Sequence, residues 1–266
     1  MSKKMLTRET LAAGQQAELE QRDGQSEVRP AAPQTVRIKP LNRRIAELGI
    51  VGTGQLVQNA FGQKAINQII ATQTAGDAAK KKMSKNRPPK DFDACYEDAK
   101  HIAGGKDGGW IGLPAPAFRA GMVRACKLAG IVMTEAKLAL VVKADGYDKY
   151  DSTPLVKITK GEPTRDTRYA RNDNGQPDIR VRPMWQPGWE CKLVIEYDGD
   201  FFTDEDVVNL VERMGVQVGI GEGRNSSPHS CGMGWGGFEV KRDGGAVFYQ
   251  RGQKAVPAPA ATSAQV

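Results

Sequence analysis

The sequence predicts a mixed α+β fold in which one antiparallel sheet carries helices on one face. Two observations support this prediction. Strand-like and helix-like segments follow one another in the order strand, helix, strands, strand, helix, strand, and such alternation favours helices packed on a sheet. The second helix then leads into a glycine-rich stretch before the last strands. This order is typical of a ferredoxin-like (RRM-like) fold with long polar insertions.

Length and composition predict one folded domain between two polar ends. The 266 residues are enough to bury a sizeable core, although the apolar fraction is only 39%. We therefore expect a disordered N-terminal arm over residues 1–34, one domain over 35–252 and a disordered tail over 253–266. No run approaches the ~20 apolar residues of a membrane span, and the start lacks the apolar core of a signal peptide. A cytoplasmic location follows as an expectation.

The first half of the domain contains two strand patterns and two helix patterns. Apolar residues lie among polar ones over 36–50, which predicts a strand. Residues 59–74 and 114–129 carry apolar side chains at helical spacing, so we expect helices there. The KLALVVK stretch at 137–143 is typical of a strand. A polar insertion is expected at about 75–95.

The second half begins with a longer polar insertion at about 145–187. It contains two short strand-like pieces, at 154–158 and 178–183, and the strand pattern of 190–197 follows it. Two tryptophans, Trp185 and Trp189, flank a Pro-Gly turn. We expect them to pack this turn rather than to stack on a ligand.

The clearest local signal is the start of the second helix. Thr203 followed three residues later by Asp206 imitates a capping box, and acidic residues in the first turn suit the positive end of a helix. We expect Gly215 to end this helix. Residues 237–242 and 246–250, separated by Asp-Gly-Gly, are typical of a hairpin.

A dense glycine segment follows that helix. Eight of the 30 glycines lie between Gly215 and Gly237. The segment has no P-loop motif, and its order of helix, glycines and strand is the reverse of a dinucleotide-binding fingerprint. Interleaved apolar residues, such as Ile220 and Trp235, argue against a linker. We therefore expect a structured glycine loop, with Trp235 in the core.

Cysteine and histidine are too few and too scattered to predict a zinc site. The four cysteines have no CxxC spacing, and the chain has only two histidines. We expect reduced thiols, no metal and no cofactor. Asp91 and Asp93 follow a lysine-rich stretch, and a metal or catalytic role explains them no better than the acidic start of a helix.

The basic charge is concentrated in two segments. The net charge is +7 and the isoelectric point is near 9.2, values that are compatible with a nucleic-acid partner. Residues 80–90 hold six basic residues and no acid, whereas residues 160–182 hold six basic residues and four acids. Either segment taken alone is also typical of a solvated loop.

The glycine loop, with its GxGxxR motif from Gly219 to Arg224, resembles that of the RAMP superfamily of CRISPR-associated proteins. It is most similar to the backbone subunits that polymerise along guide RNA. The turn at 52–57 is similar to a family turn in which proline stands where this chain has Gln55. Residues 110–120 resemble the segment that introduces the first core helix. The stretch at 180–183 and the elements after it resemble uncharacterised phage-encoded relatives.

The resemblance implies a non-catalytic protein of phage origin that coats single-stranded DNA or RNA and oligomerises head to tail in a bacterial cell. In such proteins the sheet face, the glycine loop and an inserted thumb hairpin grip the strand. Glycine loops can offer N–H groups to phosphates, basic residues release counterions, and aromatic rings stack on bases. For Arg224 we favour a phosphate contact, and Tyr169 is the candidate thumb aromatic. The candidate nucleic-acid-binding residues are Lys80, Lys81, Lys82, Lys85, Arg87, Lys90, Arg165, Arg168, Tyr169, Arg171, Arg180, Arg182, Gly221, Gly223, Arg224 and His229.

Two other functions stay open. The chain could be a structural or protein-interaction subunit of a phage assembly, with its basic loops on an acidic protein partner. It could also be a metal-independent RNA endonuclease in which His229 is the general base for a 2′-hydroxyl. Because no second histidine or tyrosine lies near His229 in the sequence, we expect no catalysis.

Overall fold

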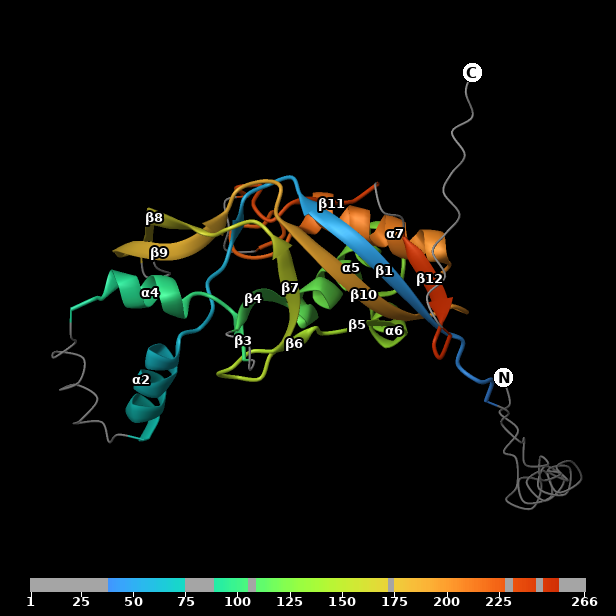
Figure 1. Cartoon of the computed structure of the whole chain (residues 1–266), viewed down its shortest axis with the longest axis horizontal. Coiled ribbons are helices and arrows are strands. Elements are labelled where there is room, and N and C mark those ends of the chain that lie inside the picture. The colour runs from blue at the N-terminus through green and yellow to red at the C-terminus, as the bar shows by residue number, and fades with distance from the viewer. Residues whose placement is uncertain are drawn as a thin grey trace, which may run out of the picture. The chain divides into compact units, whose positions relative to one another are not determined.

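The computed structural model describes residues 38–74, 89–104, 109–171, 175–227, 232–242 and 246–253 (Figure 1). The chain divides into two units, residues 1–40 and 41–266. Of the first unit only residues 38–40 are described, so the expected N-terminal arm lies outside the described residues. The same holds for the expected tail, apart from Gln253. All described helices and strands belong to the second unit.

The central sheet is built on the antiparallel pair β1 (Arg43–Gly52) and β10 (Glu190–Asp198). The other edge of β1 pairs with β11 (Phe238–Val240) and β12 (Val247–Gln250). The other edge of β10 pairs with two strands, β5 (Leu140–Val142) and β7 (Pro154–Lys160). Beyond β7 lie β4 (Trp110–Pro114), β3 (Ile102–Ala103) and β6 (Gly146–Tyr147). The described strands all pair in antiparallel fashion.

A separate three-stranded sheet has the order β2 (Leu56–Val57), β9 (Pro177–Trp185) and β8 (Thr164–Arg171). The last two strands form a hairpin inside the insertion expected at 145–187. In Figure 1 this hairpin extends away from the central sheet, next to α4 (Phe92–Asp98).

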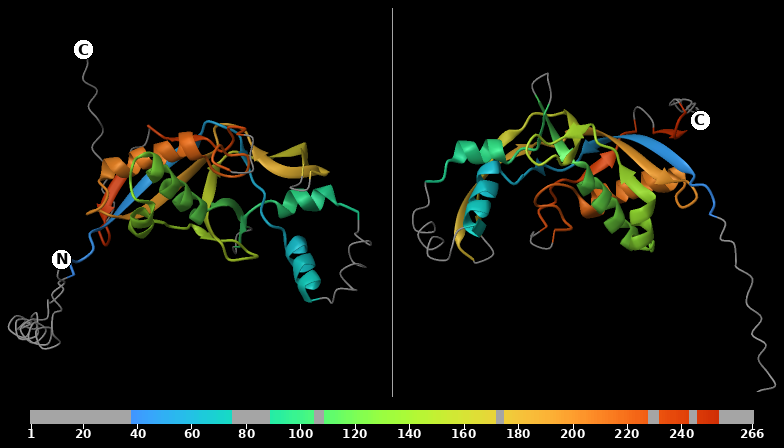
Figure 2. Two further views of the ribbon diagram at one scale, coloured as in Figure 1. Left: turned by 180° about the vertical axis from the view of Figure 1, so that it is seen from behind. Right: turned by 90° about the horizontal axis from the view of Figure 1, so that it is seen from below.

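Two long helices, α5 (Ala115–Leu128) and α7 (Asp204–Arg213), lie on the same side of β1 and β10 (Figure 2). The chain continues from α7 into a π-helical turn, η1 (Met214–Val218). The shorter α6 (Met133–Ala139) follows α5, and α2 (Gln63–Thr74) precedes α4. None of the described helices is long and apolar enough to cross a membrane.

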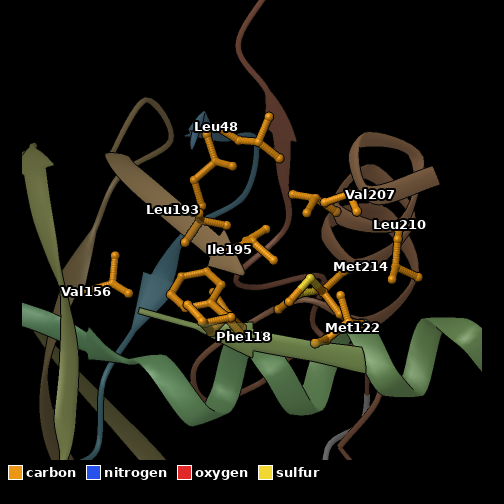
Figure 3. Close-up of a cluster of buried hydrophobic side chains, with 14 of the residues drawn as sticks. Leu48, Phe118, Met122, Val156, Leu193, Ile195, Val207, Leu210 and Met214 are labelled. Atoms are coloured by element: carbon orange, nitrogen blue, oxygen red, sulfur yellow. The ribbon is translucent and has the colours of Figure 1, made fainter. Parts of the chain in front are cut away.

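The hydrophobic core lies between the central strands and these helices. Alternate residues of β1 and β10 point to one face, and Leu48, Leu193 and Ile195 are fully buried there. Burial of each such side chain contributes about 1.5–3 kcal/mol, which explains why α5 and α7 stay on this face. Figure 3 shows the facing side chains of α5, α7 and η1, which are Phe118, Met122, Val207, Leu210 and Met214.

Several sequence predictions are confirmed. The helix expected at 114–129 is α5, and the strand expected at 190–197 is β10. The capping box is present, because the Thr203 hydroxyl accepts from the Asp206 N–H at 3.1 Å and the Asp206 carboxylate accepts from the Thr203 N–H at 2.9 Å. The tryptophans that were expected to pack inside are buried, namely Trp185, Trp189 and Trp235.

The strand predicted at 137–143 is wrong in its first half. Residues up to Ala139 belong to α6, and the strand begins only at Leu140. Ala136 and Ala139 are buried, and such small side chains let a short helix approach its neighbours closely. The predicted starts of two other elements are too early: the strand expected from residue 36 begins at Arg43, and the helix expected from residue 59 begins at Gln63.

Two predictions for the C-terminal region are also wrong. Gly215 does not end the second helix, because η1 continues to Val218. A Cβ atom on Gly215 would lie 2.0 Å from the carbonyl oxygen of Phe238, so glycine lets η1 pass close to β11. The described residues of 237–242 and 246–250 do not pair with each other as the expected hairpin requires. Both segments pair instead with the ten-residue β1, one at each end.

Candidate nucleic-acid interface

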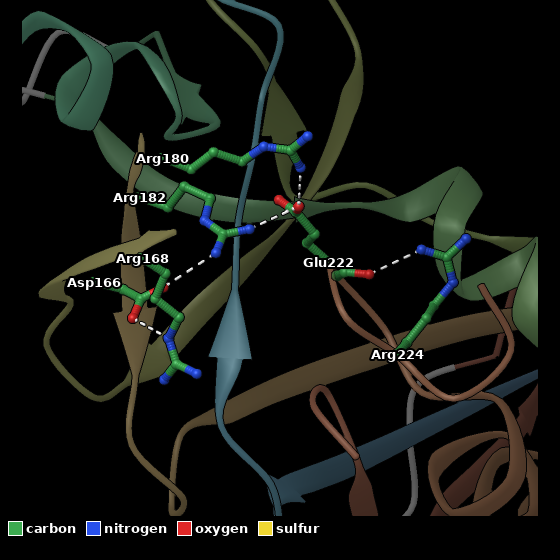
Figure 4. Close-up of polar contacts among 7 residues, drawn as sticks. Asp166, Arg168, Arg180, Arg182, Glu222 and Arg224 are labelled. Atoms are coloured by element: carbon green, nitrogen blue, oxygen red, sulfur yellow. Dashed lines mark hydrogen bonds and ion pairs between the residues drawn. The ribbon is translucent and has the colours of Figure 1, made fainter. Parts of the chain in front are cut away.

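The β8–β9 hairpin brings four charged side chains to one face. Its register places Asp166 opposite Arg182 and Arg168 opposite Arg180. Because side chains alternate along a strand, these four residues share one face, and Tyr169 with its partner Ile179 lies on the other. Glu222, from the glycine loop, meets the charged face (Figure 4).

These residues form an ion-pair network, which we name the arginine cluster: Asp166, Arg168, Arg180, Arg182 and Glu222. The Asp166 carboxylate accepts from Arg168 Nε at 2.6 Å and from Arg182 Nη2 at 3.2 Å. Arg182 Nη1 lies 2.7 Å from one oxygen of Glu222, Oε1, and Arg180 Nη1 donates a hydrogen bond to the same oxygen at 3.1 Å. Two carboxylates thus compensate three guanidinium groups.

The arginine cluster is packed against the indole of Trp235. The guanidinium carbons of Arg168 and Arg182 lie 4.7 and 5.8 Å from the ring centroid, within the range of cation–π attraction. Trp235 is only 6% exposed, and the Arg182 side chain is also 6% exposed. The cluster therefore joins the hairpin to the glycine loop as part of the folded structure.

The two predicted glycines of the loop make close packing contacts. Gly221 and Gly223 both have positive φ angles, of 77° and 72°. A Cβ atom would lie 2.6 Å from the carbonyl oxygen of Val57 in the first case and 2.2 Å from the Trp235 ring in the second. Between them, the N–H of Glu222 donates to the Val57 carbonyl at 2.9 Å. The glycines let the loop lie directly on β2 and the indole.

An open groove of about 640 Å³ lies on the other side of the glycine loop. Its walls are the outer face of α5, the nearby end of α6 and residues 218–226. Four cationic side chains line it, and we name it the basic groove: Arg119, Arg124, Lys137 and Arg224. Glu222 is the only acid among the described residues that line it.

The arginines of the basic groove are held by neutral carbonyl oxygens. Arg119 Nε donates to the carbonyl of Leu140 at 2.8 Å, and its Nη2 donates to that of Lys137. Arg124 donates to the carbonyl of Ser226 at 2.6 Å.

Arg224 donates in the same way to the carbonyl of Gly221, at 2.8 Å. Within the described part of the chain, none of the four groove cations forms an ion pair with a carboxylate. Their charges therefore remain available to an anion in the groove.

A histidine–aspartate pair borders the same groove. His101 Nδ1 lies 3.4 Å from an oxygen of Asp148, whose side chain is buried. Asp148 also accepts from the N–H of Tyr150, which holds the adjoining turn. Gln58, buried beneath, accepts from the N–H of His101 and donates to the carbonyl of Gly112. These contacts fix this end of the groove.

The structure separates the residues that the sequence predicts for one site. Arg224 lies in the basic groove, whereas Arg168, Arg180 and Arg182 lie in the arginine cluster. The Tyr169 side chain is 58% exposed on the opposite face of the hairpin. Of the candidate set, six members have side chains outside the described residues: Lys80, Lys81, Lys82, Lys85, Arg87 and His229. Arg171 lies in β8, but its side chain is likewise outside the described part.

Two further candidates near α4 have carboxylate partners. Lys90 pairs with Asp178 at 2.7 Å and donates to the carbonyl of Ile179. Arg165 pairs with Asp93 at 2.5 Å. Asp91 caps α4 by accepting from two N–H groups, each at 3.0 Å, so these aspartates form the acidic start of a helix.

Three of the four groove cations are not among the site residues that the sequence predicts. The sequence pattern predicts Arg119 and Arg124 only as part of a core helix, and Lys137 only as part of a strand. One available signal was charge, because residues 114–129 contain three basic residues and no acid. The face that these residues share with the glycine loop depends on tertiary packing.

A scan against protein-family models found no matching family, and a search of curated proteins found no match either.

Proposed function

We propose that the protein binds single-stranded nucleic acid along the basic groove, through the phosphate backbone and without catalysis. The observation that carries this proposal is the set of four groove cations that have no carboxylate partner among the residues that the structure describes. A strand of phosphates supplies the missing negative charge, and release of its counterions drives binding. Because guanidinium groups pair well with phosphate oxygens, three arginines suit this ligand.

A ferredoxin-like fold of the RAMP type is part of the proposal. Its support is the pairing order of the central sheet. Taken in chain order, β1, β5, β10 and the β11–β12 edge act as the four strands, with α5 and α7 as the connecting helices. The observed pairings place the fourth strand beside the first, the first beside the third and the third beside the second. That is the order expected of a βαββαβ unit.

The β8–β9 hairpin is the proposed counterpart of the family's thumb, and a phage-encoded protein in a bacterial cytoplasm is the proposed setting. Head-to-tail assembly along the strand completes the proposal. Large exposed apolar side chains between the end of α5 and β5 support a contact with another protein chain: Leu128, Val132, Leu138 and Val141 are exposed, Leu138 by 88%. The same side chains favour the second candidate function, a protein-interaction subunit of a phage assembly.

Fluorescence anisotropy with labelled single-stranded DNA, single-stranded RNA and duplex tests the proposal. If each groove cation meets one phosphate, the groove contributes about −3 to the slope of log affinity against log salt for single strands, from ~0.7 per contact. Tighter binding of single strands than of duplex is expected. Negligible binding to all three at low salt would contradict the proposal. Discrete oligomers that carry no nucleic acid in size-exclusion chromatography would favour the second candidate.

A further inference from the structure

Glu222 stands at the junction of the basic groove and the arginine cluster. It lines the groove, and its carboxylate oxygen Oε1 binds Arg180 and Arg182 of the hairpin. In Figure 4 it lies between these arginines and Arg224. A single carboxylate therefore occupies the place where the positive surface of the groove would otherwise continue onto the hairpin.

The second carboxylate oxygen of Glu222 has no hydrogen-bond partner among the described residues. This oxygen, Oε2, is buried. A buried acceptor without a donor costs about 1–3 kcal/mol, and more when it is charged. The side chain as a whole is 25% exposed, so it has a route to solvent. Rotation of Glu222 into water would relieve this cost.

The two arginines bound by Glu222 depend on it to different extents. Arg182 is 6% exposed, and it keeps a second carboxylate, that of Asp166, together with the indole of Trp235. Arg180 is 33% exposed, and Glu222 is its only carboxylate partner in the described part of the chain. Loss of Glu222 would thus leave Arg182 paired and set Arg180 free.

We propose that the Glu222 carboxylate occupies the position of a phosphate on Arg180, and that a phosphate of a bound strand replaces this carboxylate as the partner of Arg180. The inference rests on the proposed function, and it makes Glu222 the residue that sets where the strand leaves the groove. On binding, one phosphate takes the place of Oε1 on Arg180, while Glu222 turns toward solvent. The strand then continues from the basic groove onto the β8–β9 hairpin.

The experiment is a double-mutant cycle of Glu222→Gln and Arg180→Gln, read by the salt dependence of single-strand binding. Each phosphate contact changes the slope by ~0.7, a factor of about five in affinity between 1 M and 0.1 M salt. Arg180→Gln should make the slope shallower by this amount and weaken binding about fivefold at 0.1 M salt. Arg180→Lys, which keeps the charge, should restore the slope.

Glu222→Gln should tighten binding by up to about fivefold, because the strand no longer competes with a carboxylate. In the Arg180→Gln background the same change should have little effect. Glu212→Gln, on the exposed side of α7, is the matched control for loss of one negative charge and should leave binding almost unchanged.

Two results would overturn the exchange. One is an unchanged salt slope in Arg180→Gln, and the other is an equal gain from Glu222→Gln with and without Arg180. If Glu222→Gln fails to fold, the salt slopes of Arg180→Gln and Arg180→Lys still test the phosphate contact of Arg180, since both variants keep Glu222. Absence of binding by the wild-type protein would instead contradict the proposed function.

Discussion

The arginine cluster and the basic groove contain the same residue type and differ in what holds it. In the cluster, three guanidinium groups share two carboxylates and an indole ring. In the groove, the arginines are oriented by backbone carbonyls, and no carboxylate of the described residues compensates their charge. The partner of a cation therefore determines whether it stabilises the fold or remains available to a ligand.

The two regions should respond differently to substitution. Removal of one partner of a buried ion pair lowers the free energy of unfolding by several kcal/mol, because the other charge is left without compensation. An exposed cation held by a carbonyl contributes little to stability. Stability measurements should thus identify the buried members of the cluster, and salt-dependent binding should identify the groove together with the more exposed Arg180.

The largest expected effect is the loss of stability in Arg182→Leu. This change leaves the buried carboxylate of Asp166 with Arg168 alone and removes the shorter of the two contacts to Glu222. We expect the free energy of unfolding to fall by about 3 kcal/mol or more, measured by urea denaturation. Arg124→Gln in the groove is the matched control, with an expected change within about 0.5 kcal/mol. Equal losses in both variants would refute the distinction between the regions.

The next effect is on binding, in the triple variant Arg119→Gln, Arg124→Gln and Arg224→Gln. Glutamine keeps an N–H donor for the backbone carbonyls, so the groove should keep its shape. Loss of three contacts should make the salt slope shallower by about 2 and weaken single-strand binding roughly 100-fold at 0.1 M salt. Arg168→Gln, in the cluster, should leave the slope unchanged, because the partner of Arg168, Asp166, is buried and Arg168 also packs on the Trp235 ring. A larger slope change in Arg168→Gln than in the triple variant would assign the strand to the cluster.

A smaller effect is expected from the lysine-rich segment, which lies outside the described residues. Replacement of Lys80, Lys81, Lys82 and Lys85 by glutamine should make the salt slope shallower by about 1.4 if two of the four meet phosphates. Affinity at 0.1 M salt should fall about 25-fold for every sequence alike. The melting temperature should not change. With an unchanged slope, the segment would be a solvated loop.

The elements that could be predicted from the sequence are those with local causes. The capping box of Thr203 and Asp206 lies within four residues, and the apolar spacing of α5 is complete within the helix itself. The prediction of a C-terminal hairpin was wrong because a distant strand, β1, is long enough to pair with both segments. The local sequence of these two segments does not show how long the unpaired edge of β1 is.

The candidate site could be predicted only in part, for the same reason. Arg180 and Glu222 are 42 residues apart, so the sequence gives no sign that one compensates the other. The family resemblance and the basic charge together predict one site for Arg180 and Arg224, whereas the glycine loop runs between the cluster and the groove. Arg224 could be predicted because it belongs to the loop motif itself. Arg119 and Arg124 required the packing of the loop against α5, where Arg124 contacts Ser226.

The smallest expected effect provides a reference for both regions, because Thr203 belongs to neither. Thr203→Ala removes the hydroxyl that accepts from the Asp206 N–H and should lower the free energy of unfolding by about 1 kcal/mol. Single-strand binding should stay at the wild-type level, which would show that a modest loss of stability does not by itself weaken binding. A weakening comparable to that of the groove variant would remove the basis for assigning binding to the groove.

The stability difference between Thr203→Ala and the wild type should also depend on pH. Hydrogen bonds from the Thr203 hydroxyl and N–H hold the pKa of Asp206 below its usual value. A carboxylate whose pKa is lower in the folded state adds stability above its unfolded pKa of about 3.9 and loses it as the pH falls through the folded value. The variant keeps only the N–H donor, so the gap in melting temperature should be widest above about pH 4 and should narrow toward more acidic pH. A gap that widens on acidification would mean that the Asp206 carboxylate is not stabilised by this cap.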